Sequence, residues 1–377
     1  MRWWQNSRRP YDAGPMRLRT LPWLVVLLWT GACTKKPVHY RKLDVHTHFG
    51  PEAADHMLQL MDRFGVETVV NLSGETPGQG LEENLQVARQ HPGRIVVFTN
   101  VDWEQVRRGP GYGQRLAEDV ARAHALGAKG LKIYKALGLA VRDAQGRLIP
   151  VDDPDLDPMF DKAGELGMPV AIHTGDPVAF WEPVTPANER YDELTVHPQW
   201  ALYRRGVPSW EALFAQLERR IAKSAKTTFI SVHFGNAPEY PDRVAALLDK
   251  YPNLYVDTAA RVPEIGRQPQ QKMHDLLTHY APRILFGTDL GVGRDPSQLM
   301  LGSSGAEPPT DEDTAYFFSS TWRYFETWDR TFRHPTPIQG RWPIDGVGLE
   351  PTVLAQIYGE NARRLLHLDA PAASPAP

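Results

Sequence analysis

The segment "LDVHTHFG", from Leu43 to Gly50, places two histidines one residue apart after a short apolar run and ends on glycine. The alternation of apolar and polar residues predicts a strand, in which successive side chains point to opposite faces. We expect Leu43 and Val45 to lie on one face of this strand. His46 and His48 then share the other face, where two imidazoles can converge on one point, as metal ligands do. Solvated histidines at a strand end, or core histidines bonded to the backbone, would give the same short pattern.

The composition is that of an ordinary globular protein. The chain has 377 residues, of which 42% are apolar and 23% are charged, and its formal net charge is −3. This length is enough for one large domain or two smaller ones. No basic run or stripe occurs in the body of the chain, so nucleic acid is not an expected partner. We expect a small-molecule substrate instead.

The first 33 residues form a segment of a different kind. A basic stretch, "MRLRT" (16–20), precedes the apolar stretch "LPWLVVLLW" (21–29), which suits the core of a signal peptide and is too short for a membrane span. The residues "TGAC" (30–33) resemble the cleavage box of bacterial lipoproteins, although Thr30 stands where that box usually has leucine. We therefore expect residues 1–33 to be a leader and residues 34–40 a linker.

This interpretation predicts an exported protein of the bacterial cell envelope, attached to a membrane through a lipid on Cys33. An uncleaved anchor or an ordinary signal peptide would explain the same residues. Cys33 is the only cysteine in the chain, which excludes an intrachain disulfide.

Short apolar segments alternate with longer segments of helical period from residue 41 to residue 368. The predicted strands are Arg41–His46, Glu67–Leu72, Arg94–Val101, Lys129–Tyr134, Pro169–His173, Thr228–His233, Asn253–Asp257 and Arg283–Thr288. The predicted helices include Ala53–Phe64, Leu81–His91, Gln114–Leu126, Leu156–Leu166 and Arg243–Lys250. Successive strand–helix units predict parallel strands and, most economically, an α/β fold of the (β/α)8 TIM-barrel type. A doubly wound open sheet is the alternative, but no glycine-rich phosphate loop follows the first strand.

Two long segments do not fit a bare barrel. Asp176–Gly206 follows the fifth predicted strand, and Gly291–Gly346 follows the eighth. Loops after the strands of such a barrel surround its active site, so we expect these insertions to form lids or walls of a pocket. Contacts between the subunits of a homo-oligomer are the other interpretation. The tail, residues 369–377, is rich in proline and alanine, which predicts disorder.

Ionisable residues stand at the ends of several predicted strands. His46 and His48 end the first, His173 ends the fifth in "PVAIHTG", and His233 ends the sixth in "FISVHFG". Asp289 follows the eighth in "ILFGTDLG". Apolar residues alternate onto the opposite face of the fifth, sixth and eighth predicted strands, and these are Val170 and Ile172, Ile230 and Val232, and Ile284 and Phe286. A barrel would gather all five ionisable side chains at its carboxyl-terminal rim, although a single strand-end histidine or capping aspartate is commonly structural.

These residue types favour a divalent metal ion. Neutral imidazole and carboxylate suit zinc, iron(II) or manganese, and the lack of nearby cysteine argues against a closed structural zinc site. Ligands that leave one position open for water make a catalytic site. Such an ion lowers the pKa of water from ~15.7 toward ~7, and neighbouring acid–base groups add roughly 10²–10⁴-fold in rate. We expect zinc, with iron or manganese as alternatives.

Together these motifs resemble the amidohydrolase superfamily, and most closely its amidohydrolase-related branch, which holds both hydrolases and non-oxidative decarboxylases. The resemblance runs from about residue 42 to residue 368 and rests on "DVHTHFG", "GAKGLKIY", "PVAIHTG", "SVHFGN", "LYVDTAA", "ILFGTDL" and "VLAQIYGENARRLL".

The resemblance implies roles for the five ionisable residues. His46 and His48 would bind the metal, with His173 and Asp289 completing the ligand set. Asp289 would also move the proton of the activated water. His233 would be a second-site ligand in binuclear members, or a base or electrophilic group beside the substrate in mononuclear ones.

Some binuclear members use a carbamylated lysine at the end of the fourth strand. Here "KGLKIYK" offers Lys132 and Lys135. Lys132 is on the inward face if Leu131 and Ile133 face the helices, but it lies inside the run, and Lys135 is on the other face. We therefore expect a single ion, with Lys132 in a structural or substrate-facing role.

Three functions fit these residues. The first is metal-dependent hydrolysis of an amide, ester or lactone, in which His233 stabilises the developing oxyanion. The second is non-oxidative decarboxylation of an aromatic or enol acid, and the third is a non-catalytic surface lipoprotein that keeps the barrel for binding. Arg261 and Arg294 follow the last two strands and would suit a substrate carboxylate, although a surface salt bridge explains either one.

Overall fold

The computed structural model describes residues 40–295 and 297–368. The predicted leader and tail, and all but the last residue of the predicted linker, lie outside these residues. Within them, the larger sheet has ten strands in the order β10-β9-β1-β2-β3-β4-β5-β6-β7-β8, and β11 pairs with β12 separately. The strands are β1 (Lys42–Phe49), β2 (Val66–Asn71), β3 (Ile95–Thr99), β4 (Gly130–Ile133), β5 (Val170–Ile172), β6 (Phe229–Ser231), β7 (Leu254–Asp257), β8 (Ile284–Leu285), β9 (Leu290–Val292), β10 (Leu299–Leu301), β11 (Phe332–Arg333) and β12 (Pro343–Ile344).

Strands β1 to β8 confirm the predicted order of parallel strands. Each pairs in parallel with the next one along the chain. Two backbone hydrogen bonds join β1 to the segment that continues β8: Val45 N donates to Phe286 O, and Asp289 N donates to His46 O, both at 2.9 Å. The sheet therefore curls until β1 meets the segment that follows β8.

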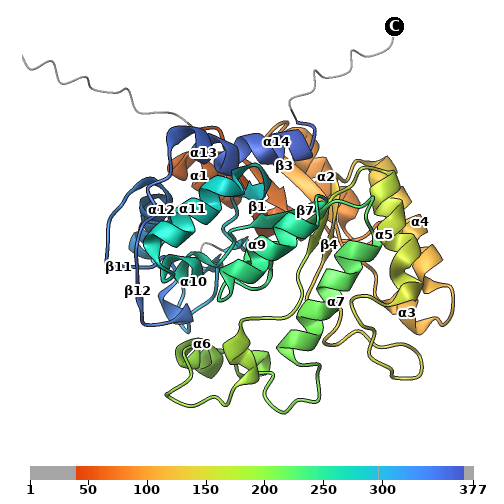
Figure 1. Ribbon diagram of the computed structural model, residues 1–377. Coiled ribbons are helices and arrows are strands. Elements are labelled where there is room, and N and C mark those ends of the chain that lie inside the picture. The colour runs from red at the N-terminus through yellow and green to blue at the C-terminus, as the bar shows by residue number, and fades with distance from the viewer. Residues whose placement is uncertain (1–39, 296, 369–377) are drawn as a thin grey trace, which may run out of the picture. The chain divides into compact units, whose positions relative to one another are not determined.

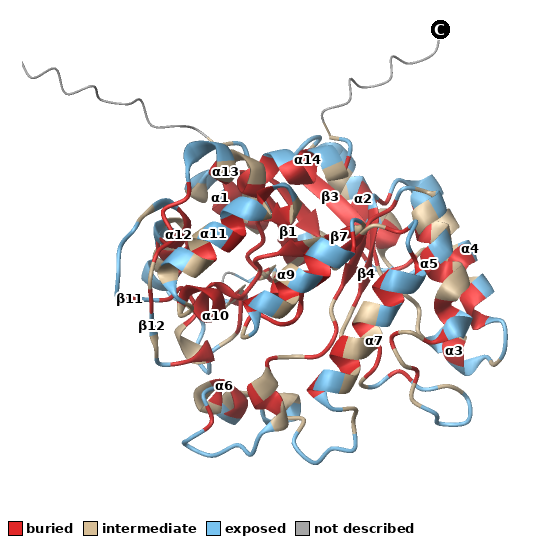
Figure 2. Cartoon of the chain, in the orientation of Figure 1, coloured by how far each residue is buried: buried red, intermediate tan, exposed pale blue. Residues whose placement is uncertain are grey.

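Helices surround the curled sheet (Figure 1). They are α1 (Ala54–Phe64), α2 (Leu81–Gln90), α3 (Glu104–Arg107), α4 (Tyr112–Leu126), α5 (Asp157–Glu165), α6 (Tyr191–Val196), α7 (Trp210–Lys223), α8 (Val232–Gly235), α9 (Pro241–Lys250), α10 (Val262–Gly266), α11 (Gln270–His279), α12 (Asp311–Glu326), α13 (Pro351–Ala355) and α14 (Asn361–Leu365). The predicted helices occur as α1, α2, α4, α5 and α9. Their apolar sides are buried and their polar sides exposed (Figure 2). Gly65 and Gly127 end α1 and α4 in the left-handed conformation, which glycine adopts without steric cost.

The sheet separates two apolar layers. Outward side chains such as Leu131 pack with the helices in the larger cluster of buried residues. Inward side chains such as Ala171 form a smaller cluster that includes Leu366, next to α14. From α14, Arg363 Nη2 reaches Thr68 Oγ1 near the start of β2, at 3.4 Å. The C-terminal helix therefore covers the amino ends of the strands, and the carboxyl ends remain for the site.

The face predicted for the apolar residues of β1 is wrong. Leu43 and Val45 belong to the inner cluster, although His46 also faces inward. The pairing of β1 with β2 shifts by one residue between Asp44 and Thr47. An extra residue of this kind changes the face to which the following side chains point, so both sets of side chains reach the interior.

The prediction for β6 is wrong in the same way. Ile230 and Val232 also belong to the inner cluster, and the strand ends at Ser231. Strict alternation would therefore have turned His233 toward the helices. The backbone after the strand is left-handed instead, with φ of 56° at His233 and 53° at Phe234. This turn carries the imidazole back to the interior.

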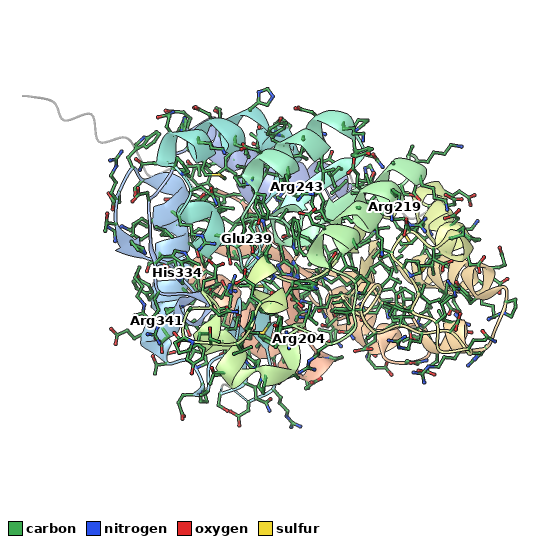
Figure 3. All side chains as sticks on the ribbon, turned by 60° about the horizontal axis from the view of Figure 1, so that its bottom comes forward. Arg204, Arg219, Glu239, Arg243, His334 and Arg341 are labelled. Carbon is green, nitrogen blue, oxygen red and sulfur yellow. The ribbon has the colours of Figure 1, made fainter. Side chains whose placement is uncertain are left out.

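The segments after β5 and β8 are long. Residues 173–209 contain α6 and two short 3-10 helices, Val178–Trp181 and Pro198–Trp200, and residues 290–350 contain β9 to β12 and α12. Glu193 links the two segments, because its Oε1 accepts from Ser303 Oγ at 2.6 Å. Its Oε2 accepts from Arg190 Nη1 of its own segment at 2.7 Å. Figure 3 shows this end of the molecule.

No helix among residues 40–295 and 297–368 has the length and apolar character needed to cross a membrane.

Candidate metal centre

The five ionisable residues singled out in the sequence line one cavity at the carboxyl ends of the strands. These residues are His46, His48, His173, His233 and Asp289, and the cavity has a volume of about 300 Å³. This volume lies at the lower end of the range for small-molecule sites.

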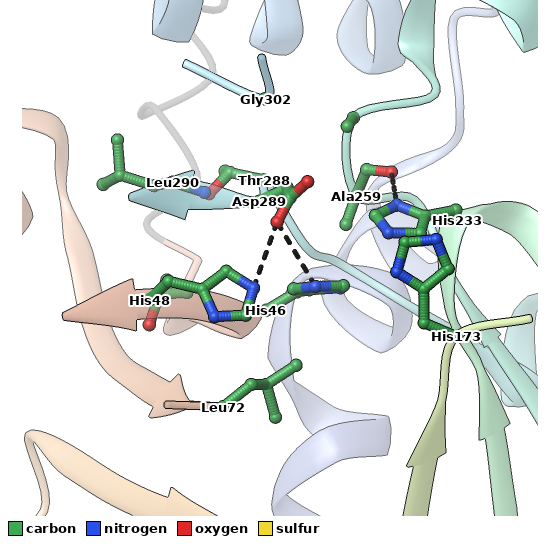
Figure 4. A network of polar contacts seen from close by, with 12 residues as sticks. His46, His48, Leu72, His173, His233, Ala259, Thr288, Asp289, Leu290 and Gly302 are labelled. Carbon is green, nitrogen blue, oxygen red and sulfur yellow. Dashed lines mark hydrogen bonds and ion pairs between the residues drawn. The ribbon is translucent and has the colours of Figure 1, made fainter. Parts of the chain in front are cut away.

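Asp289 contacts both histidines of β1. Its Oδ1 lies 3.3 Å from His46 Nε2 and 3.3 Å from His48 Nε2 (Figure 4). The three ligand atoms lie within 4.8 Å of one another. Burial alone would raise the pKa of Asp289, but the nearby His46, His48 and His233 outweigh it and hold that pKa well below its usual value. The centre therefore presents an ionised carboxylate to two imidazoles.

His173 and His233 lie farther along the same cavity. Their ring centroids are 4.4 Å apart, and the His233 centroid is 4.9 Å from that of His46. His173 stays outside the compact group of His46, His48 and Asp289. Its Nε2 is buried and finds no hydrogen-bond partner among the described residues, with Asp176 Oδ1 3.9 Å away. A buried polar atom without a partner is costly, which is consistent with a ligand there.

The hydrogen bond of His233 fixes its tautomer. Nδ1 lies 2.9 Å from the carbonyl oxygen of Ala259 (Figure 4). Because a carbonyl can only accept, Nδ1 carries the proton and Nε2 is left as an acceptor. Burial, and then the charge of Arg261, lowers the pKa of His233 well below its usual value, so the ring is neutral. A neutral Nε2 can take a proton, whereas the expected stabilisation of an oxyanion would require a proton on it.

His233 and Asp289 share an uncommon backbone conformation. Their φ angles are 56° and 62°. Few residues other than glycine adopt this left-handed region, although asparagine, aspartate and histidine do so more often than the rest, and such conformations cluster at functional sites.

Asp257, at the end of β7, supports the centre, and the sequence reasoning gave it no role. Its Oδ2 accepts from His46 Nδ1 at 2.8 Å, and its Oδ1 accepts from the backbone N–H groups of His233 and Ala259 at 2.8 and 3.1 Å. Burial raises the pKa of Asp257, while the charges of His233 and Lys132 oppose that rise. The motif "LYVDTAA" ends a strand on aspartate, and this was the available signal.

Asp257 therefore determines which ring nitrogen of His46 carries the proton. With its proton on Nδ1, His46 directs the lone pair of Nε2 toward Asp289. Asp257 also forms a compact group with His46 and His233. Because its oxygens already accept hydrogen bonds from these two residues, we assign it to positioning and not to coordination.

The two lysines of the fourth strand lie at different depths. Leu131 and Ile133 pack with the helices, so Lys132 faces inward, as predicted. Its Nζ lies 3.3 Å from His46 Nε2, and burial lowers the pKa of Lys132 to about 8, against the opposing charges of Asp289 and Asp257. Lys135 lies at the cavity wall, where its Nζ is 2.8 Å from Asp176 Oδ1.

The structure separates the two candidate arginines. Arg261 is buried and lines the cavity, whereas Arg294 is exposed and lies outside the cavity lining. Among the described residues, Arg261 Nη1 donates to the carbonyl oxygen of Ala260 at 2.9 Å and the side chain has no ion pair. Another arginine of the cavity, Arg190, is paired with Glu193 at 2.7 Å.

The donor set fits a divalent cation. His46 Nε2 and Asp289 Oδ1 are both acceptors, and they face each other with His48 Nε2 beside them. The ammonium of Lys132, 3.3 Å from His46 Nε2, places one positive charge beside this group, and two imidazoles with one carboxylate are ligands that also suit zinc, iron(II) or manganese.

Several solved enzymes share this fold. A 4-oxalomesaconate hydratase from Rhodopseudomonas palustris is 17% identical, with a TM-score of 0.52 over 87% of this chain and 97% of that one. A dihydroxybenzoic acid decarboxylase from Polaromonas sp. JS666, with bound manganese and the inhibitor 2-nitroresorcinol, is 15% identical, with a TM-score of 0.52 over 88% and 98% of the two chains. A 2,6-dihydroxybenzoate decarboxylase from Rhizobium is 17% identical, with a TM-score of 0.50 over 88% and 99%. At these identities the likeness concerns the fold alone. No curated protein sequence matches the chain.

A family model described as amidohydrolase matches residues 43–368. The matched span contains the five ionisable residues predicted from the sequence and nearly all of the described chain. The chain therefore belongs to the amidohydrolase family and is an enzyme of the amidohydrolase type.

Proposed function

We propose that the protein is a metal-dependent hydrolase that cleaves a C–O or C–N bond of a small molecule, such as an ester, lactone or amide. The observation that carries this proposal is the convergence of His46 Nε2, His48 Nε2 and Asp289 Oδ1 beside a neutral His233. We also infer that the curled sheet is a (β/α)8 barrel with insertions after strands five and eight. The hydrogen bonds between β1 and the end of β8 support that inference.

His46, His48 and Asp289 would hold the cation, with His173 as the fourth expected ligand. When bound, a divalent cation supplies Lewis acidity, which polarises a substrate oxygen and lowers the pKa of water. Zinc is our first expectation, and iron or manganese would suit the same donors.

The protein's own acid–base groups lie on two sides of the cavity. Asp289 is ionised, and His233 is neutral with Nε2 free to accept. One of them can take the proton of the attacking water, and the same proton can be returned to the leaving group. Proton transfer by positioned groups of this kind contributes about 10²–10⁴-fold in rate.

Arg261 points to an anionic group on the substrate. Its guanidinium lines the cavity and has no carboxylate partner among the described residues, while Arg190 and Lys135 are paired. A buried guanidinium is stable only if its donors are satisfied, and a carboxylate of the substrate would satisfy them.

The same arginine favours a second candidate, the non-oxidative decarboxylation of an aromatic or enol acid. In that reaction the bond from carbon to the carboxyl group breaks, CO₂ leaves and a proton takes its place. Two of the structural relatives are named as decarboxylases of dihydroxybenzoates, which is compatible with this candidate.

Isotope labelling separates the two reactions. The full-length protein would be purified with its metal, the ion measured per chain, and a panel of lactones, esters, amides and aromatic acids supplied in ¹⁸O-water. Hydrolysis predicts ¹⁸O in the product and no CO₂, whereas decarboxylation predicts CO₂ without ¹⁸O in the product.

A pair of histidine variants tests the metal requirement. His46→Ala should lose both the bound ion and the activity, and His124→Ala, which changes an exposed histidine of α4, should keep both. A protein that is active without a stoichiometric ion, or an active His46→Ala variant, would contradict the proposal.

We further propose export and lipid attachment through Cys33. The leader-like residues 1–33 support this, and they lie outside the described residues. Mass spectrometry of the membrane-bound protein should find a mature chain that begins at an acylated Cys33. A Cys33→Ser variant should lack the acyl groups, and an unmodified Cys33 in the wild-type protein would contradict the proposal.

A further inference from the structure

We propose that Tyr134, acting through Ser73, determines which ring nitrogen of His48 carries its proton and so prepares His48 Nε2 to bind a cation. Both are positioning residues, because they act through His48. This inference rests on the proposed metal site and gives two further residues of the cavity lining a specific task.

A continuous chain of hydrogen bonds runs away from His48. His48 Nδ1 lies 2.9 Å from Ser73 Oγ. Ser73 Oγ lies 3.1 Å from Tyr134 Oη, and Tyr134 Oη donates to the carbonyl oxygen of Leu72 at 2.9 Å. The chain thus starts at a candidate ligand and ends on a backbone carbonyl.

The carbonyl end gives the chain its direction. The oxygen of Leu72 can only accept, and it takes one hydrogen bond from Tyr134 and a second from Asn100 Nδ2 at 2.8 Å. The single hydroxyl proton of Tyr134 is therefore used toward Leu72.

The direction of the hydrogen bonds at Ser73 and His48 follows in the same way. With its proton used, Tyr134 Oη offers Ser73 only lone pairs, so Ser73 donates to Tyr134. The hydroxyl of Ser73 then offers His48 a lone pair, and His48 Nδ1 must carry the proton. In this direction His48 Nε2 is unprotonated. Asp289 Oδ1, 3.3 Å from that nitrogen, favours a proton there in the metal-free protein, so the hydrogen-bond chain opposes Asp289 until a cation lies between the two groups.

Ser73 is held where this chain needs it. Its backbone N–H donates to Asn71 Oδ1 at 2.9 Å, and Asn71 Nδ2 donates to the carbonyl oxygen of Phe49 at 2.9 Å, on the strand that carries His48. β1 and the loop after β2 are therefore tied together beside the imidazole. The opposite direction of the chain, with Ser73 donating to His48, would remove the hydrogen bond that Tyr134 Oη accepts from Ser73 and place the histidine proton on Nε2.

The tautomer of His48 can be observed directly in the metal-free, full-length protein with ¹⁵N-labelled histidine by NMR. His48 would be identified by the signal that disappears in His48→Gln. We expect the Nδ1–H form in the wild-type protein and a shift toward Nε2–H in Tyr134→Phe, where the hydroxyl of Ser73 becomes free to donate to His48. The signal of His46, whose Nδ1 is held by Asp257, should not change and serves as an internal control.

Metal affinity gives the second measurement. By competition with a chelator, the dissociation constant for Zn²⁺ should rise about 10–100-fold in Ser73→Ala and in Tyr134→Phe, the usual effect of removing a partner of a ligating histidine. Ser73→Thr keeps the hydroxyl and should restore most of the affinity. Tyr112→Phe, which removes a buried hydroxyl bonded to Asp153 outside the cavity lining, should leave the affinity unchanged.

The outcomes separate this inference from the proposed function. An unchanged His48 tautomer together with a Zn²⁺ dissociation constant within twofold of wild type, in both Tyr134→Phe and Ser73→Ala, would overturn the inference. A wild-type protein that binds no ion would overturn the proposed function, and the tautomer measurement would still test the chain of hydrogen bonds from Tyr134 to His48. If Tyr134→Phe does not fold, Ser73→Ala tests the same link.

Discussion

Asp257 Oδ2 lies 2.8 Å from His46 Nδ1, and both side chains are buried. β1 and β7 carry these residues and are not adjacent in the sheet. The pair exists because the sheet curls, and it directs the lone pair of His46 Nε2 at Asp289. Carboxylate–histidine pairs of this kind orient ligating imidazoles and raise their basicity.

Asp257→Asn should weaken metal binding. The amide N–H₂ group placed against His46 Nδ1 would oppose one donor with another, so the Zn²⁺ dissociation constant should rise about 10–100-fold. Chelator competition measures this directly. Asp311→Asn, which changes an exposed aspartate of α12, is the matched control and should bind as wild type does. Equal affinities for the two variants would mean that Asp257 does not orient His46.

His233→Asn should lower turnover without releasing the ion. Asparagine tolerates the left-handed backbone at this position but cannot take a proton, so kcat should fall about 10²–10⁴-fold. Metal analysis of the purified variant should still find one ion per chain. Loss of the ion together with activity would instead make His233 a ligand and would favour a second metal position.

Arg261→Met should impair binding of anionic substrates. Hydrogen bonds to charged groups contribute about 1.5–3 kcal/mol, so KM for an acid should rise about 10–100-fold. The uncharged methyl ester or amide of the same acid should be affected much less. Arg294→Met, which removes an exposed arginine outside the cavity, is the control. A similar loss for charged and uncharged substrates would show that Arg261 does not bind the anionic group.

His334 should make the protein less stable in mild acid. Burial lowers the pKa of His334 to about 4, while in the unfolded chain it is about 6.5. Between these pH values the unfolded chain binds more protons than the folded chain. His334 therefore adds about 3 kcal/mol to the free energy of unfolding above pH ~6.5, and this contribution is lost as the pH falls toward 4.

Urea unfolding at pH 7.5 and pH 4.5 tests this. In His334→Gln the loss of unfolding free energy between the two values should be about 2–3 kcal/mol smaller than in the wild-type protein. Glutamine can still donate to the carbonyl oxygen of Gly340, which His334 Nε2 contacts at 3.0 Å. The exposed His124→Gln should behave as wild type does, and an equal acid-induced loss in His334→Gln would refute the assignment.

The sequence alone predicted the order of β1 to β8 and the five ionisable residues that line one cavity. Alternating apolar segments located β1 to β8, and glycine at the ends of α1 and α4 marked where helices stop. The parity argument also placed His173 and Lys132 on the inner face, because β4 and β5 have no irregularity before those residues. Asp289 also lines the cavity, although β8 ends at Leu285 and the backbone of Asp289 is left-handed. Period-2 alternation is a local property, so it can be read wherever a strand is regular.

Only the tertiary structure determined which side chains change face and which groups share hydrogen bonds, because local periodicity carries no information about either. The shift in β1 and the left-handed turn at His233 move side chains to another face, and both are set by pairing and packing with neighbouring strands. The partners of His46 and His48, namely Asp257 and Ser73, come from other strands and loops, and so does the distinction between Arg261 and Arg294. Which groups share a hydrogen bond depends on the curl of the whole sheet, and that curl is a sum of many long-range pairings that no single segment of the sequence specifies.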